Sequence, residues 1–201
     1  MLGAVNYGAF ARPADMPAEP FDLRRALALF LADHPEQAAD AGLFSHFLAS
    51  SPDVFERRHP PGHFTGSAWL VSADGQRVLL THHRKLARWL QLGGHADGDA
   101  DLARVALREA EEESGLTDLV VEGGIFDLDR HLIPARGADP DHWHYDVRFV
   151  VRATGSEAFA ISEESLALAW KPVAEIAADP SADESMRRMA GKWLSAGSRS
   201  G

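Results

Sequence analysis

Residues 93–116 read GGHADGDADLARVALREAEEESGL, and this stretch decides the fold. Asp97, Asp99 and Asp101 offer short oxygen acceptors for the free amides at a helix start, and Gly115 stands where a left-handed cap ends a helix. Between these signals, apolar residues recur at helical spacing: Leu102, Val105, Ala106 and Ala110. The pattern predicts a helix that buries this apolar face against the rest of the protein.

The same helix carries acidic side chains on its apolar side. Glu109 and Glu113 fall within the apolar stripe, and Glu112 lies on its flank. Like charges four residues apart repel each other, and the last turn of a helix disfavours negative charge. A hard cation such as Mg²⁺, or Mn²⁺ in its place, would offset both costs because these three carboxylates converge on one point. Arg108 can hold one carboxylate in place. A solvated acidic helix end is the alternative, but it leaves the shared apolar face unexplained.

The stretch resembles the box of the Nudix hydrolase family, G-x5-E-x7-R-E-U-x-E-E-x-G-U, in which U is aliphatic. The matching residues are Gly94, Arg108, Glu109, Ala110, Glu112, Glu113, Gly115 and Leu116. Ala100 departs from the pattern, because the family has a glutamate there that helps to arrange the metal site. The resemblance implies an α/β/α sandwich with a mixed sheet. It also implies metal ligation by Glu109, Glu112, Glu113 and the backbone at Gly94, and catalytic roles for these glutamates and Arg108.

Length and composition limit the classes of function. The 201 residues suit one ordinary domain plus an extension, with 45% hydrophobic and 25% charged residues. A net charge of −10 argues against a long nucleic acid as partner, whereas a small phosphorylated substrate fits a local cationic pocket. The chain has no cysteine, which excludes disulfides and thiol catalysis. The sequence shows neither a leader-like segment nor a membrane-length apolar run, so we expect a cytoplasmic location.

The chain divides into an N-terminal part, residues 1–60, and a Nudix-like domain, residues 61–201. A proline-rich arm is followed by a predicted helical hairpin over residues 22–49, too small to hold its own core. Its apolar face must therefore pack on the main domain or on another subunit, as in a homodimer. Strands are predicted over 64–72, 77–81, 119–122, 125–132, 145–153 and 167–170, with a closing helix over 183–194. Leu31 and Leu194 are among the side chains predicted to face inward.

Substrate contacts are predicted at Arg84, Arg88, His95, His144, Arg148, Glu163 and Glu164. The basic segment 82–88 can act as a phosphate clamp or as a solvated loop, and both interpretations stay open. His144 shares a strand face with His142, Asp146 and Arg148, where a substrate contact is favoured over a metal site. Glu163 and Glu164 are included because of the family resemblance, since in Nudix enzymes an acidic residue from a late loop often serves as metal ligand or general base.

Two classes of function fit the sequence. The first is a Mg²⁺-dependent hydrolase that cleaves a diphosphate linkage in a nucleoside diphosphate-linked or related small phosphorylated metabolite. The alternative is a non-catalytic, ligand-binding or regulatory module on the same fold, which Ala100 favours. A third resemblance, to the isoprenoid diphosphate isomerase branch, conflicts with the absence of cysteine, because the common form of that branch uses a catalytic cysteine. The sequence leaves the identity of the substrate open.

Overall fold

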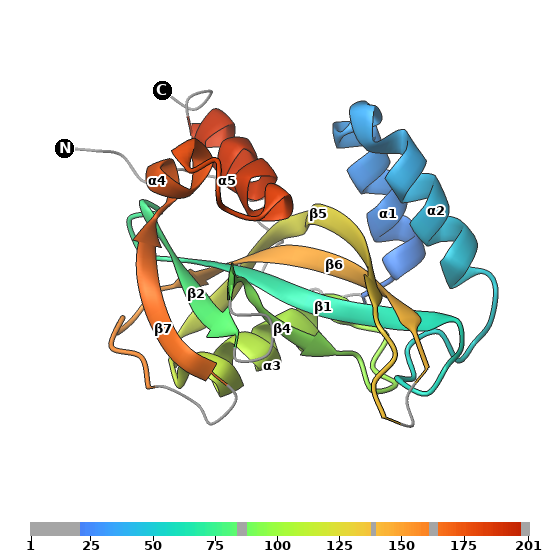
Figure 1. Cartoon of the computed structure of the whole chain (residues 1–201). Helices are drawn as coiled ribbons and strands as arrows, with labels where there is room; N and C mark the ends of the chain where they lie inside the picture. Colours follow the sequence, from blue (N-terminus) through green and yellow to red (C-terminus); the bar gives the residue numbers. More distant parts are fainter. Residues whose placement is uncertain (1–20, 84–87, 138–139, 161–164, 198–201) are drawn as a thin grey trace, which may run out of the picture.

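The computed structural model describes residues 21–83, 88–137, 140–160 and 165–197 (Figure 1). Its helices are α1 Leu23–Asp33, the 3-10 turn η1 Pro35–Gln37, α2 Ala38–Leu48, α3 Leu102–Ser114, α4 Val173–Ala178 and α5 Glu184–Gly197. Its strands are β1 Gly62–Val71, β2 Arg77–His83, β3 Arg88–Leu90, β4 Leu92–His95, β5 Leu119–Ile133, β6 His142–Ala153 and β7 Ser165–Pro172. The predicted α/β class is therefore confirmed.

The strands form one mixed sheet in which β1 is central. It runs parallel to β6 along its whole length and antiparallel to β4 and β2. The order is β3-β2-β1-β6-β5, with β7 on β2. The pairing of β1 with β4 places Gly93 opposite Ser67 and Gly94 opposite Gly66. This register brings the glycine pair to the middle of the sheet, directly beside α3.

Alternation along β1 creates two apolar cores. Phe64, Ala68 and Leu70 face the larger core, which α1, α2 and α3 close. Trp69 and Val71 face the smaller core, which α4 and α5 close. Figure 1 shows the sheet lying between α5 and α3, as in the predicted α/β/α sandwich.

The N-terminal hairpin packs on its own chain. Asp22 caps α1 by accepting a hydrogen bond from the Arg24 backbone at 2.9 Å. The ring of Phe47 stacks on Tyr145 of β6 at 3.7 Å between ring centres. Since this contact and the larger core cover the hairpin's apolar face, the face itself does not require a second subunit. The domain boundary between residues 60 and 61 stays a prediction.

Some local expectations are wrong. Leu31 and Leu194 are 38% and 43% exposed, because each lies at the edge of a helix face that its neighbours bury. The two strands predicted over 119–132 form a single strand, β5, with irregular pairing between Glu122 and Asp127. Among the helices of the described residues, none has the length and hydropathy needed to cross a membrane.

Candidate active site

Local sequence signals fix the position of α3. Asp101 caps its start by accepting the Arg104 N–H at 3.0 Å, and Gly115 ends it with φ of 67°. The predicted apolar face of α3 is buried. Gly66 of β1 permits the helix to lie close, because a Cβ there would come within 2.9 Å of a Val105 methyl group. Helix and sheet therefore hold the acidic turn in one fixed place.

Two glutamates of α3 contact the glycine pair of β4. Glu113 accepts a hydrogen bond from the Gly93 N–H at 2.8 Å. Gly94 leaves room for Glu109, since a Cβ at Gly94 would overlap that carboxylate. Arg108 donates to Glu109 Oε1 at 2.9 Å and to the His95 carbonyl at 3.1 Å. Arg108 thus holds the carboxylate of Glu109 in place, and the glycine pair, which has no side chains, makes the close approach of both glutamates possible.

Glu112, the third predicted ligand, is exposed on the surface of α3. Ala100 is exposed as well, just before the helix. Its acidic neighbours serve the helix start: Asp99 binds the Arg104 guanidinium at 2.6 and 2.9 Å, and Asp101 is the cap. Neither acid therefore stands in for the glutamate that Ala100 replaces.

The oxygen donors of Glu109, Glu112 and Glu113 suit Mg²⁺ chemically, because that ion takes oxygen ligands. The space at Gly94, which a Cβ would fill, also suits a close approach of a ligand to the backbone. In the described part of the chain, however, the group of side chains spaced to hold a metal ion consists of His63, His95 and His144.

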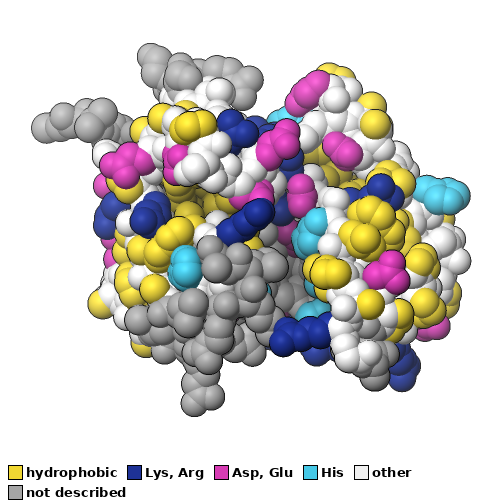
Figure 2. Space-filling model, viewed as in Figure 1, with side chains coloured by type: hydrophobic (Ala, Val, Ile, Leu, Met, Phe, Trp, Pro, Cys, Tyr) yellow, Lys and Arg dark blue, Asp and Glu magenta, His cyan; other side chains and the backbone are white. Residues whose placement is uncertain are grey.

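The other predicted substrate contacts are dispersed. Arg84, Glu163 and Glu164 lie outside the described residues. Arg88 is exposed, 3.6 Å from Asp183, and borders a hollow of about 780 Å³ between β3 and α4–α5. Figure 2 shows histidine and charged side chains gathered around a depression between α4–α5 and the hairpin.

His95 and His144 belong to a histidine cluster that includes His63, which the sequence analysis missed. His63 lies opposite His144 in the parallel β1–β6 pair, and His95 lies opposite Thr65. Burial lowers the pKa of His63 to about 4 and that of His144 to about 2, with the neighbouring histidines adding to both shifts. These two rings are neutral at pH 7. The cluster follows from the register of the paired strands, which cannot be derived from the sequence alone.

Arg148 lies in a buried charge network. It is 2% exposed and contacts Asp146 at 2.7 Å, Asp129 at 3.2 Å and Asp127 at 3.4 Å. Arg188 and Lys192 of α5 also bind Asp127. Burial alone would lower the pKa of Arg148, but Asp146 and the other carboxylates raise it. Acidic side chains and α5 enclose the guanidinium, which favours a structural role for Arg148, and the substrate contact stays a prediction.

We expect Arg148→Met to lower the free energy of unfolding by about 3–5 kcal/mol, because it leaves buried carboxylates without their cation. Arg104→Met is the control, since the exposed Arg104–Asp99 pair should contribute at most about 1 kcal/mol. Urea denaturation of both variants provides the measurement. Equal losses in the two variants, or a stable Arg148→Met protein with only a raised KM, would contradict the structural role.

Comparisons with known proteins agree on the fold. Residues 63–191 match the NUDIX domain family. A possible asymmetric diadenosine tetraphosphate (Ap4A) hydrolase from Jonesia denitrificans has a similar structure, with a TM-score of 0.53, 15% identity and coverage of 69% of this chain and 96% of that one. The binary complex of a C. elegans Ap4A hydrolase gives a TM-score of 0.52, 16% identity and coverage of 66% and 95%. A NUDIX family hydrolase from Clostridium perfringens gives a TM-score of 0.50 and 22% identity, with coverage of 66% of this chain and 96% of that one. Among proteins with curated descriptions, none matches the chain.

Proposed function

Because the chain belongs to the NUDIX domain family, we propose that it is a Mg²⁺-dependent hydrolase that cleaves a diphosphate linkage in a small phosphorylated metabolite. The contact of Glu109 and Glu113 with the glycine pair carries this proposal. A rigid helix there holds two half-buried carboxylates against a strand that leaves space for a ligand. The proposed substrate class is a nucleoside diphosphate-linked compound. The proposed location of the protein is the cytoplasm.

The reaction forms a bond between a water oxygen and phosphorus and breaks a bridging P–O bond of the diphosphate. When bound, a divalent ion neutralises phosphate oxygens and helps to activate the attacking water. Glu109, Glu112, Glu113 and the Gly94 carbonyl would hold that ion. One carboxylate of this group takes the proton from water, and Arg108 keeps Glu109 oriented through its hydrogen bond. Mn²⁺ can replace Mg²⁺ in a site of oxygen ligands.

A substrate panel tests the proposal. Nucleoside diphosphate sugars, ADP-ribose, dinucleoside polyphosphates, nucleoside triphosphates and coenzyme A are incubated with the protein, and phosphorus-containing products are quantified. Dinucleoside polyphosphates enter the panel because two similar structures carry the name Ap4A hydrolase. We expect turnover of at least one compound with Mg²⁺ and none with EDTA. A panel left intact under both conditions would reject the hydrolase.

The second candidate function is a non-catalytic ligand-binding module, and Ala100 is the observation that favours it. Such a module would bind a member of the panel, seen by calorimetry, without producing phosphate or nucleotide products. Binding without turnover would therefore replace the first proposal by the second.

Ala100→Glu restores the family's side chain at an exposed position before α3. We expect this variant to lower the Mg²⁺ concentration for half-maximal rate several-fold, because an added carboxylate strengthens the attraction for the ion. Ala38→Glu, an exposed change at the start of α2, is the control for added charge and should leave that concentration unchanged. A Mg²⁺ titration of the rate decides the matter. Equal Mg²⁺ requirements in wild type and Ala100→Glu would show that Ala100 is not the cause of a weakened site.

A further inference from the structure

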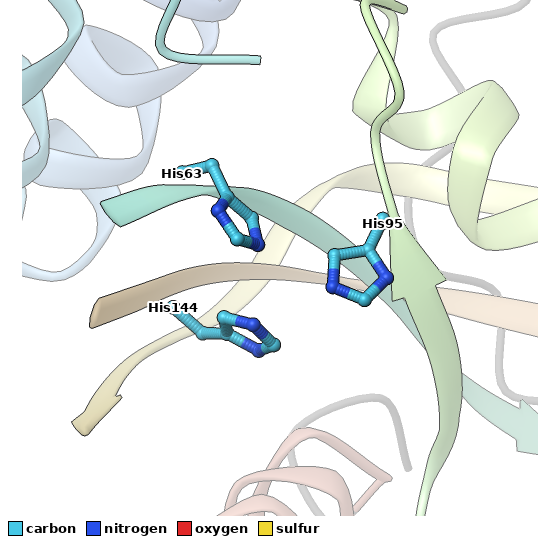
Figure 3. A group of neighbouring side chains, drawn as sticks. All are labelled: His63, His95 and His144. Carbon is cyan, nitrogen blue, oxygen red and sulfur yellow. The ribbon is translucent and has the colours of Figure 1, made fainter. Parts of the chain in front are cut away.

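The histidine cluster joins three strands that are far apart in sequence. His63 comes from β1, His95 from β4 and His144 from β6, and Figure 3 shows their rings turned toward a shared space. The ring centres lie 4.7 Å apart for His63 and His144, 5.0 Å for His63 and His95, and 5.2 Å for His95 and His144. One ring nitrogen of each residue lies within 4.8 Å of the other two. The sheet therefore brings three potential ligands to one point.

Burial makes this arrangement costly without a ligand. His63 is 1% exposed, and neither of its ring nitrogens has a hydrogen-bond partner among the described residues. Nε2 of His144 is also buried without a hydrogen-bond partner among these residues. Buried polar atoms almost always have a partner, and each exception calls for an explanation such as a bound ion. Two such rings side by side, His63 and His144, with the half-buried His95 within ligand distance of both, point to one shared partner.

The chemistry of the donors selects the kind of ion. Neutral imidazole suits Zn²⁺, Ni²⁺ and Co²⁺, whereas Mg²⁺ prefers oxygen. Tetrahedral Zn²⁺ with bonds of about 2.0–2.1 Å requires nitrogens about 3.3 Å apart. Small rotations of the three side chains would close the present spacing of up to 4.8 Å. Three histidines would leave the fourth position of a tetrahedral ion open.

We propose that His63, His95 and His144 bind one divalent transition-metal ion of the Zn²⁺ class, at a site separate from the carboxylates of α3. Strand alternation separates the two sites: Gly94 faces Glu109, whereas His95 lies on the opposite face of β4, the face on which Gly93 meets Ser67. The second site does not depend on the proposed hydrolase activity. It would give the chain two metal centres of different ligand chemistry on either side of one glycine-rich strand.

Zinc binding to the chelator-treated full-length chain tests the proposal without any substrate. We expect calorimetry with ZnCl₂ and metal analysis after dialysis to give about one tightly held ion per chain, which excess Mg²⁺ does not displace. Co²⁺ in its place should give the visible absorption of a four-coordinate site.

Variants at the half-buried ligands keep the test independent of folding. His95→Gln and His144→Gln should each weaken Zn²⁺ binding by more than about a hundredfold, because even partners outside the ligand set change affinity by 10–100-fold. His46→Gln on the exposed side of α2 is the matched control and should bind like wild type. Circular dichroism of each metal-free variant verifies its fold.

Glu113→Gln separates this inference from the proposed function. It should retain full Zn²⁺ binding even though it impairs the carboxylate site. Wild-type protein without a tightly bound ion, or unchanged affinity in both His95→Gln and His144→Gln, would overturn the proposed zinc site. Loss of Zn²⁺ binding in Glu113→Gln with retention in the histidine variants would also overturn it, because the ion would then lie on α3.

Discussion

Glu113→Gln is expected to lower turnover of the active panel compound by about a hundredfold or more, judged from what metal-held nucleophiles contribute to catalysis. The amide oxygen of glutamine can still accept the Gly93 N–H, so the contact at 2.8 Å survives while the negative charge is lost. Repulsion between Glu109 and residue 113 also falls, and the free energy of unfolding of the metal-free protein should therefore hold or rise slightly.

Glu111→Gln provides the matched control, because Glu111 is exposed on the same helix and occupies a position that the family's box leaves unspecified. Its rate should equal that of wild type. Steady-state rates with saturating Mg²⁺ and thermal denaturation with EDTA are the two measurements. Should Glu113→Gln keep the full rate and lose stability, the acidic turn is structural and the proposed site is wrong.

Deletion of residues 1–55 is expected to cause aggregation or a changed oligomeric state. The deletion removes the partners of Phe64 and Tyr145, whose rings contact Phe47 at 5.2 and 3.7 Å between centres. It would uncover the part of the larger core that α1 and α2 close, leaving an apolar patch too large for a typical monomer. Light scattering and size-exclusion chromatography measure the outcome.

Point variants test the same contact in a chain of full length. Phe47→Ala should cost about 3–5 kcal/mol of stability, because its side chain is 5% exposed and fills the core. Leu29→Ala on the outer side of α1, 58% exposed, should change stability by less than about 0.5 kcal/mol. If the protein without residues 1–55 stays soluble, with the oligomeric state and kinetics of the whole chain, the proposed structural role of the hairpin is wrong.

The sequence predicted those parts of the site that depend on neighbours along the chain. The caps Asp101 and Gly115 and the apolar stripe of α3 are local features, and the structure has them as expected. Contact of Glu109 and Glu113 with protein also follows from that stripe, because a helix turns its apolar face inward. The exposed Glu112 matches its predicted place on the flank.

Features that depend on contacts between distant segments were out of reach. Alternation placed Arg148 on the face of His144 and Asp146, but it could not show that Asp127 and α5 enclose that arginine. His63 is a single histidine at the start of an apolar strand, and only the pairing of β1 with β4 and β6 gives it two histidine neighbours. Strand register and helix placement therefore explain why the sequence alone revealed neither the surroundings of Arg148 nor the histidine cluster.

Hydrolysis of the active compound in oxygen-18 water tests the central claim most directly. If the chain is a Mg²⁺-dependent hydrolase of diphosphate linkages, mass spectrometry should find one labelled oxygen per cleaved linkage, bound to phosphorus in a product, with Mg²⁺ and not with EDTA. The label marks the new bond between water oxygen and phosphorus. Products with no oxygen-18 bound to phosphorus, or a panel that stays intact with both Mg²⁺ and Mn²⁺, would contradict the claim.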